Sequence, residues 1–484
     1  MLPFLPFIPT AAAALTPPLL LLTPNAPSAS LPACLQSAYH GTYAGESVYL
    51  PSNECASSAS SFLDAGSIVP LSSHSDEAHL VWVGAAGIEG VGLRADVAAV
   101  WDVITTAATV SFADAAILAG QQSEQVAFSS PAHSPAVAPT LVHASQSGLF
   151  LSVPASTLGV LDTLLPRGYV PVGIPAEPLP FNYDIPVKYA EHLANVTKGL
   201  RFDPTVNEIV ESISASQIRA DVRWLTGEDS EIITRHSFTE GARIAAQWIK
   251  EKMETTGASC ELFPFLEGFA PDVICEYPSV SDSEERVILS GHYDSRGSFG
   301  NTRAPGGDDD GSGSAHVLAV GHAIKEHGVK FDKKVTLCFF AGEEQGLWGS
   351  HYYAKHLAET NATVILQIQA DMLAYRVPGE PLQLGLPATI ELAEASYLVA
   401  NLSALYAPEL VVGRTAACCS DHQSFLSYNF PATQVFERNG WIADPMYHNS
   451  GDLSDREGYD FEQIQSIAKV TLAAVLEVGG WSHL

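Results

Sequence analysis

RVILSGHYDSRGSFGNTRAPGGDDDGSGSA, residues 286–315, begins with an apolar run that has the length and composition of a buried strand. The run ends at His292 and Asp294, and a glycine-rich loop then leads through three consecutive aspartates into a helix that we expect to begin near Ser312. Adjacent carboxylates repel one another unless protons or a cation neutralise them. The stretch therefore predicts a strand, a loop and a helix, with a positively charged partner for the loop.

The chain downstream of residue 187 alternates expected helices with expected strands. After the strand at 286–291, apolar runs occur at 334–342 (KVTLCFFAG), 363–370 (TVILQIQA) and 432–437 (ATQVFE), and a further helix is expected near Leu347. This alternation is typical of a mostly parallel sheet that helices cover on both faces. We therefore expect an α/β fold for residues 188–484.

A helix is also expected within SFTEGARIAAQWIKEKMETTG, residues 237–257. Ser237 and Glu240 have the spacing of a capping box, and Gly257 is a typical stop. The apolar side chains expected on one face of this helix are Ile244, Trp248, Ile249 and Met253.

A second, smaller domain is expected upstream of a proline-rich linker. Residues 171–186 read PVGIPAEPLPFNYDIP, a proline density that neither a helix nor a central strand tolerates, so we place the linker at 176–187. Residues 30–175 are predicted to form an α+β accessory domain or pro-domain. Its expected strands are AHLVWVGAAG (78–87), QVAFSS (125–130), GLFLSV (148–153) and GYVPVGI (168–174), and its expected helix is DVAAVWDVITTAA (96–108).

The composition indicates a globular protein that does not bind nucleic acid. The 484 residues exceed the usual size of one domain, and 46% are hydrophobic while 16% are charged. The formal net charge of −30 argues against phosphate-backbone binding, which needs clustered lysine and arginine.

The N-terminus and the cysteines suggest secretion. Residues 1–29 are apolar, uncharged and interrupted by prolines, which favours a cleaved signal peptide over a membrane anchor, and no other apolar run is long enough to span a bilayer. Glycosylation sequons begin at Asn195, Asn361 and Asn401. In an oxidising compartment, Cys34–Cys55 and Cys260–Cys275 could pair, and Cys338 is expected to be a buried thiol.

Polar side chains follow several of the expected strands at their carboxyl ends, where ligands collect in open α/β sheets. These side chains are His292, Asp294, Glu343, Glu344 and Asp371. Such a cluster of histidine and carboxylates is stable only if protons or metal ions neutralise it, and a divalent metal is the simplest answer. The mixed nitrogen and oxygen ligands favour zinc over calcium. A calcium loop also fails on spacing, because the twelfth position counted from Asp308 is Ala319, and neither H-E-x-x-H nor G-x-S-x-G occurs.

Six ordered motifs carry a resemblance to a known family. GHYDS, PGGDDDGSGSA, FAGEEQGLWGS, QADM, CSDHQSF and DPMYHNSGD occur in the order and approximate spacing of the co-catalytic di-zinc aminopeptidases of metallopeptidase family 28. The resemblance covers roughly residues 190–484. It implies a zinc-peptidase-like sandwich and a zinc-dependent exopeptidase that acts on peptides with a free N-terminus.

The resemblance also implies a role for individual residues. Asp309 would bridge two zinc ions, His292 and Asp371 would complete one metal site, and Glu344 and His448 would complete the other. Glu343 would be the general base that takes a proton from a metal-bridging water. Asp294 would orient His292, and Tyr447 would steady the oxyanion. Asp308 and Asp310 would need only capping or supporting roles.

Substrate preference rests on fewer residues. Met372 and Phe436 resemble walls of the family's apolar pocket for the first side chain, although core packing explains both equally well. Some family members have Cys-x-x-x-Cys before Ser-Asp-His. Here Thr415 stands at the first of those positions, and vicinal Cys418 and Cys419 leave either a disulfide or two free thiols.

Three alternatives to an aminopeptidase stay open: a carboxypeptidase of the same fold, a glutaminyl cyclase that uses one zinc ion, and a binding ectodomain without activity. The retained ligand set argues against the cyclase, and the retained Glu343 argues against a silent domain. The N-terminal domain could be an inhibitory prosegment, a folding assistant or a permanent partner. The oligomeric state is not indicated.

Overall fold

The computed structural model describes residues 19–24, 31–58, 66–71, 78–89, 96–109, 138–181 and 185–483, apart from residues 300, 302 and 418. Among these residues, no helix is long and apolar enough to cross a membrane.

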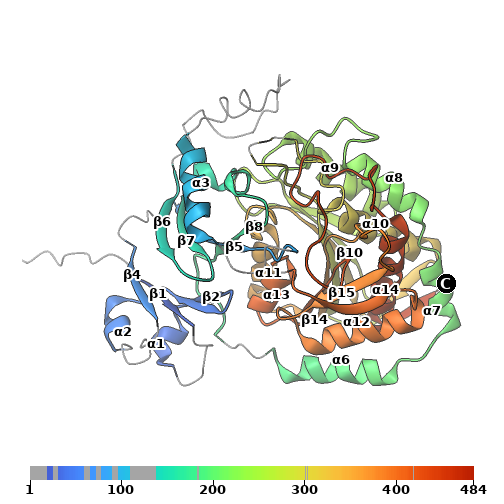
Figure 1. Ribbon diagram of the computed structural model, residues 1–484. Coiled ribbons are helices and arrows are strands. Elements are labelled where there is room, and N and C mark those ends of the chain that lie inside the picture. Colours follow the sequence, from blue (N-terminus) through green and yellow to red (C-terminus); the bar gives the residue numbers. More distant parts are fainter. Residues whose placement is uncertain are drawn as a thin grey trace, which may run out of the picture.

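A six-stranded sheet forms the centre of the C-terminal part (Figure 1). Its strand order is β17-β14-β11-β13-β10-β9. The first four strands are parallel to one another, and β10 is antiparallel to both of its neighbours, β13 and β9. The expected mostly parallel sheet is therefore confirmed. The strands are β9 (Ser259–Phe263), β10 (Asp272–Tyr277), β11 (Glu285–His292), β13 (Lys334–Phe340), β14 (Thr363–Ala370) and β17 (Ala432–Val435).

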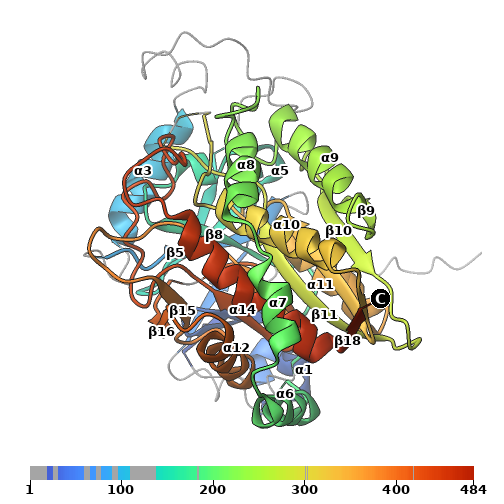
Figure 2. The same ribbon diagram turned by 90° about the vertical axis from the view of Figure 1, so that its right-hand side faces the viewer.

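Helices cover both faces of this sheet, because side chains along each strand alternate between two apolar cores. Val287 and Leu289 of β11 enter the larger core, whereas Ile288 enters the other. The larger core is covered by the helices in front in Figure 2, and α11 and α13 cover the opposite face. The helices of the larger core are α6 (Val187–Gly199), α7 (Pro204–Glu211), α8 (Ala215–Leu225), α9 (Glu240–Glu254), α10 (Gly311–Glu326), α12 (Ala393–Tyr406) and α14 (Phe461–Gly479). The opposite helices are α11 (Trp348–Glu359) and α13 (His422–Ser427).

Helix α9 begins later than its expected capping box. Its N-cap is Thr239, whose side chain accepts a hydrogen bond from the Ala242 amide. Ser237 instead is buried beside the sheet edge, so the predicted cap was wrong. The predicted apolar face is only partly right, because Ile249 and Met253 are buried whereas Ile244 is 47% exposed. Small alanines take its place against the core.

Two short strand pairs complete the C-terminal part. β12 (Val329–Phe331) pairs antiparallel with β18 (Trp481–His483), and β15 (Gln383–Pro387) pairs parallel with β16 (Val411–Thr415).

The N-terminal part contains two four-stranded sheets. The first, β2-β3-β1-β4, consists of β1 (Leu19–Thr23), β2 (Tyr39–Tyr43), β3 (Glu46–Tyr49) and β4 (Ser67–Pro70). The second, β6-β7-β5-β8, consists of β5 (Ala78–Ala85), β6 (Thr140–Ala144), β7 (Leu149–Pro154) and β8 (Tyr169–Ile174). The helices are α1 (Ala33–Gln36), α2 (Asn53–Ser58), α3 (Val97–Thr109) and α5 (Ala155–Leu158), with a 3-10 turn at Asp162–Leu164.

These elements agree with three of the four expected strands and with the expected helix; the fourth strand, at 125–130, lies outside the described residues. The linker boundary stays a prediction. Residues 176–181 lack regular structure, and α6 begins at Val187.

Strand β1 lies within the segment that is predicted to be a signal peptide. It pairs with both β3 and β4, and Leu20, Leu21 and Leu22 are almost completely buried. Removal of residues 1–29 would therefore take an interior strand out of this sheet.

The cysteines form the two expected disulfides, Cys34–Cys55 and Cys260–Cys275, and Cys338 is a free buried thiol. Cys419 is disulfide-bonded, whereas Cys418 lies outside the described residues.

Candidate metal centre

The polar residues expected at one sheet edge do lie there. His292 is the last residue of β11, Glu343 and Glu344 follow β13 closely, and Asp371 follows β14 directly. Asp309 lies in the loop that opens α10. Because parallel strands end at the same edge, segments far apart in sequence bring their side chains together there.

Two groups of side chains could each hold a metal ion. One consists of His292, Asp309 and Asp371, and the other of Asp309, Glu344 and His448. Asp309 belongs to both: its Oδ1 lies 3.3 Å from Nε2 of His292, and its Oδ2 lies 3.3 Å from Nε2 of His448. Each carboxylate oxygen thus faces a different group, which is the arrangement that a bridging ligand needs.

The spacing of the donor atoms suits zinc. Nε2 of His448 lies 3.2 Å from Oε2 of Glu344, and Nε2 of His292 lies 3.8 Å from Oδ1 of Asp371. Donor atoms bound tetrahedrally to zinc at about 2.0–2.1 Å lie about 3.3 Å from one another. Nε2 of His292 and Oε1 of Glu344 are also buried without a hydrogen-bond partner. The residues present therefore fit a pair of cations.

The electrostatics of these groups show an excess of negative charge. Burial alone would lower the pKa of His292, but Glu343 and the other surrounding carboxylates raise it well above its usual value. The pKa of Asp309 is lowered, because the nearby imidazoles of His292 and His448 outweigh the effect of burial. A protonated His292 can thus supply positive charge that a metal would otherwise bring.

Glu343 is placed differently from its neighbour Glu344. Its Oε2 lies 3.9 Å from Nε2 of His292, and it belongs to neither metal group. Burial raises its pKa well above the usual value, and Asp371 and Glu344 add to that effect against the opposing influence of His292. A carboxylate with a raised pKa beside a metal site is suited to accept a proton.

Asp294 contacts one residue of each metal group. Its Oδ1 lies 3.3 Å from Nδ1 of His292, on the ring side away from Asp309. Its Oδ2 accepts hydrogen bonds from Ser237 Oγ at 3.0 Å and from the Glu344 amide at 3.3 Å. Asp294 can therefore orient the imidazole and also fix the backbone of Glu344. The sequence did not indicate the part that Ser237 takes here.

The other two aspartates of the triplet bind backbone amides. Asp310 caps α10 by accepting from Gly313, and it also accepts from the His292 amide. Asp308 accepts from the Ala374 amide at 2.8 Å. Neither belongs to a metal group, which agrees with the supporting roles expected for them. The peptide bond between Asp309 and Asp310 is cis.

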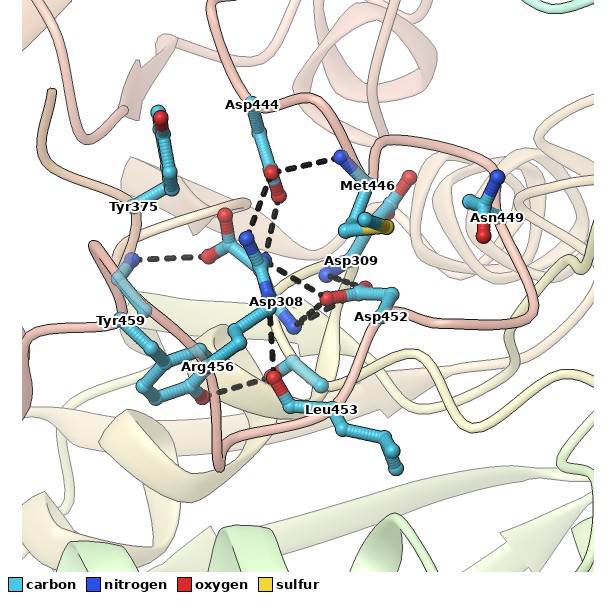
Figure 3. A network of polar contacts seen from close by, with 12 residues as sticks. Asp308, Asp309, Tyr375, Asp444, Met446, Asn449, Asp452, Leu453, Arg456 and Tyr459 are labelled. Atoms are coloured by element: carbon cyan, nitrogen blue, oxygen red, sulfur yellow. Dashed lines mark hydrogen bonds and ion pairs between the residues drawn. The ribbon is translucent and has the colours of Figure 1, made fainter.

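A buried ion network connects the loop of Asp309 to the loop of His448 (Figure 3). Arg456 donates two hydrogen bonds to Asp444, at 2.7 and 2.6 Å, and one to Asp452 at 2.9 Å. Asp452 accepts from the amides of Asp308 and Asp309, while Asp444 accepts from the Met446 amide. Arg456 thus fixes these two loops relative to each other. No motif in the sequence points to it.

The N-terminal part also contacts the metal centre. Arg296 donates to the carbonyl oxygens of Leu165 and Tyr169, and its Nη1 lies 2.9 Å from Nδ1 of His448. Because arginine can only donate, Nδ1 accepts and Nε2 carries the ring proton toward Asp309 and Glu344. A cation can bind Nε2 of His448 only when the ring proton lies on Nδ1 instead. Nδ1–H and the Arg296 guanidinium would then both be donors, so Arg296 would have to move away from Nδ1.

A second contact of the N-terminal part lies next to Glu344. Asp162 is fully buried, and its carboxylate lies 3.1 Å from Nε2 of His236, which in turn lies 3.2 Å from Nε2 of Gln345. Burial alone would raise the pKa of Asp162, but His236 and Arg296 lower it, while Asp162 raises the pKa of His236 against burial. Both shifts favour the ionised form of this pair.

The three remaining predicted site residues lie in one apolar cluster beside the metal groups. Tyr447, Met372 and Phe436 are almost fully buried there, and the Tyr447 ring stacks on His448 at a centroid distance of 3.7 Å. Met372 and His448 both have φ of 52°, a left-handed conformation that is rare for such residues and typical of functional sites.

The sequence model described as peptidase family M28 matches residues 272–475. A probable leucine aminopeptidase of Arthroderma otae is 27% identical over 294 residues, which is 59% of this chain and 78% of the relative. Leucine aminopeptidase 1 of Ajellomyces capsulatus is 25% identical over 311 residues, 60% of this chain and 78% of the relative.

Among solved structures, the LapA aminopeptidase of Legionella pneumophila matches with a TM-score of 0.55 and 19% identity over 71% of this chain and 94% of its own. LapB of the same organism matches with a TM-score of 0.56 over 71% of this chain and 95% of its own, also at 19% identity. At this identity, the likeness concerns the fold.

Proposed function

Because residues 272–475 belong to peptidase family M28, we propose that the protein is a zinc-dependent aminopeptidase that removes apolar residues from the N-terminus of peptides. The relatives that are named leucine aminopeptidases support the reaction class. We further propose that the site holds two zinc ions.

The single observation that carries the proposal is the shared Asp309. Its two carboxylate oxygens face two separate groups, each of which contributes a histidine and a second carboxylate. Two cations held close together repel strongly, and a carboxylate between them makes their separation tolerable. A site for a single ion would not need this arrangement.

The residues around the metals would divide the work of hydrolysis. Zinc, when bound, supplies a Lewis acid that polarises the peptide carbonyl and lowers the pKa of the attacking water. Glu343 takes the proton from that water and later delivers it to the leaving amine. Tyr447 offers a phenol hydroxyl to the oxygen on which negative charge develops. Asp294 holds His292 in one orientation throughout.

The surroundings suit a substrate with a free amine and an apolar side chain. The excess of carboxylates around the metal groups attracts an ammonium group. The apolar cluster with Met372, Phe436 and Tyr447 lies directly beside them.

Hydrolysis of leucine p-nitroanilide by the purified full chain tests the proposal. We expect hydrolysis that 1,10-phenanthroline abolishes and added zinc restores, and no hydrolysis of the N-acetylated substrate, which lacks the ammonium group. Release of C-terminal residues from an N-blocked peptide would instead identify a carboxypeptidase. An absence of hydrolysis with zinc present would contradict the proposal.

We also propose that the protein is secreted. The two disulfides are typical of an oxidising compartment. Asn195, Asn361 and Asn401 of the three sequons are all exposed, as glycan attachment requires. Mass spectrometry of protein from the culture medium, before and after deglycosylation, would test this and would identify the mature N-terminus.

A further inference from the structure

The apolar cluster beside the metal groups contains residues from both parts of the chain. Its members are Ala86, Ile88, Met372, Ala417, Phe436, Ile442 and Tyr447, all buried. We refer to these seven residues as the apolar cluster. Ala86 and Ile88 come from the N-terminal part, which lies outside the residues 272–475 that match the family.

The C-terminal members of the cluster are neighbours of metal-group residues in the chain. Met372 follows Asp371, and Tyr447 precedes His448. In each of these two pairs, the polar residue belongs to a metal group and its neighbour belongs to the apolar cluster, and Met372 and His448 have a left-handed backbone. A peptide whose first carbonyl lies at the metals thus has this cluster within reach of its first side chain.

The segment with Ile88 is held against the C-terminal part by backbone hydrogen bonds. The Ile442 amide donates to Gly87 O at 3.0 Å, the Glu89 amide donates to Ile442 O at 2.9 Å, and Ile88 pairs with Ile442 as a parallel bridge. The Glu89 carboxylate also lies 3.0 Å from Nη1 of Arg438. These contacts on both sides of Ile88 hold its backbone in place against the C-terminal part.

Gly87 shows how closely the segment approaches. It has φ of +92°, and a Cβ at this position would lie 2.8 Å from the carbonyl oxygen of Ala416. Any other residue would push the segment away from the chain that precedes Ala417, a member of the apolar cluster. On its other side, Ile88 lies against Gly168, where a Cβ would come within 2.7 Å of Ile88 Cδ1. Ile88 is therefore enclosed from both parts.

We propose that Ile88 limits the length of the substrate side chain that the apolar cluster accepts, so that the N-terminal part is a permanent specificity element of the enzyme. Isoleucine is β-branched and its side chain is stiff, which makes it a fixed wall. The expected substrates carry an aliphatic first residue, such as leucine or methionine, in preference to an aromatic one. This inference rests on the proposed aminopeptidase function.

The test compares kcat/KM for the p-nitroanilides of alanine, leucine and phenylalanine. Shortening the wall with Ile88→Ala should raise the ratio of phenylalanine to leucine hydrolysis about tenfold, the size of effect that a few methylene groups have on a hydrophobic pocket. Lengthening it with Ile88→Phe should lower that ratio and leave alanine hydrolysis unchanged. Ile68→Ala, at an isoleucine of the same part that is 51% exposed, is the matched control and should leave the ratio unchanged.

The outcomes separate the inference from the function. Opposite shifts of the ratio in the two Ile88 variants cannot arise from loss of folding, and they would support the inference. Equal ratios in wild type and both variants would overturn it. An equal rise of kcat/KM for all three substrates would also overturn it, because the segment would then restrict access to the site and not the length of the side chain. A wild-type protein with bound zinc that hydrolyses none of the three would overturn the proposed function itself.

Discussion

Glu343 and Glu344 are adjacent in the chain but have different surroundings. Glu344 belongs to a metal group with His448, while Glu343 lies outside both groups, with its carboxylate 3.9 Å from Nε2 of His292. The amides of both residues lie within 3.4 Å of the Asp294 carboxylate, which fixes the backbone between them. One acid can therefore bind metal while the other exchanges protons.

Glu343→Gln should lower kcat by a factor of about 10²–10⁴, the usual contribution of a general base. Glutamine has nearly the same shape and cannot accept the proton, so the zinc content should stay at the wild-type level. Steady-state kinetics with leucine p-nitroanilide and metal analysis of the same preparation check both points. Glu344→Gln is the matched variant and should lose zinc. Wild-type kcat in Glu343→Gln would rule out the assigned role.

The sequence predicts the types of residue at the site better than their division of labour. Three aspartates at 308–310 look alike in the sequence, and only the resemblance selects Asp309. The structure separates them by their partners, because Asp308 and Asp310 accept backbone amides while Asp309 faces two histidines. Ser237 was predicted to cap a helix, and its contact with Asp294 spans 57 positions, which no local pattern reveals.

At the scale of elements, the loop from Asp444 to Arg456 contains the metal-group residue His448 and also Arg456, the arginine that holds the loop in place. Arg456 has a side chain that is 11% exposed, and the Asp444 side chain is fully buried. The pKa of Arg456 is raised, because the charges of Asp452 and Asp444 outweigh the effect of burial, so the guanidinium stays charged. The loop is thus held by a paired charge inside the protein.

Arg456→Met should lower the free energy of unfolding by about 3–5 kcal/mol, because it leaves the buried carboxylates of Asp444 and Asp452 without their positively charged partner. Arg376→Met is the control. Its partner is Asp460, and the Arg376 side chain is 35% exposed, so its loss should cost about 1 kcal/mol or less. Urea unfolding at neutral pH measures both. Equal losses in the two variants would show that the Arg456 network does not contribute as the structure indicates.

The elements themselves were predicted well where the apolar pattern is long. The strand at 363–370 has the bounds that its sequence indicates, and the helices near Ser312 and Leu347 begin within one residue of their expected starts. The face of α9 was predicted less well, because Ile244 is exposed while Ala242, Ala245 and Ala246 pack against the core. Periodicity alone does not show where the core needs small side chains.

At the scale of the whole molecule, the two parts meet at the metal centre. Asp162 contacts His236 across 74 positions, and Leu165 contacts Arg296 across 131. These contacts depend on how the N-terminal and C-terminal parts pack together, and no local sequence pattern predicts them. The sequence predicts that an N-terminal α+β part exists, but it leaves open whether that part touches the site.

Asp162→Asn should destabilise the protein in a pH-dependent way. The pKa of Asp162 is lowered on folding, so its stabilising effect is present above about pH 4 and is lost at lower pH. The pKa of His236 is raised, so its contribution is complete below about pH 6.5 and is lost as the pH rises through the folded-state value. Wild type and variant should therefore differ most between these limits.

Thermal unfolding of both proteins from acid to alkaline pH measures that difference. Asp96→Asn, at an exposed carboxylate of the N-terminal part whose Oδ1 accepts the Ala99 amide, is the control, and its difference from wild type should be smaller than that of Asp162→Asn. A difference between wild type and Asp162→Asn that stays constant across the range would contradict the ionised pair.

Metal analysis of wild type and two variants tests the central claim, that Asp309 is shared by two cation sites. The proteins are equilibrated with zinc, passed through a desalting column and measured by inductively coupled plasma mass spectrometry. We expect two zinc ions in wild type, one in Asp371→Asn, which damages only the group with His292, and none in Asp309→Asn, which damages both. Wild type with no retained zinc, or Asp309→Asn with two zinc ions, would contradict the account.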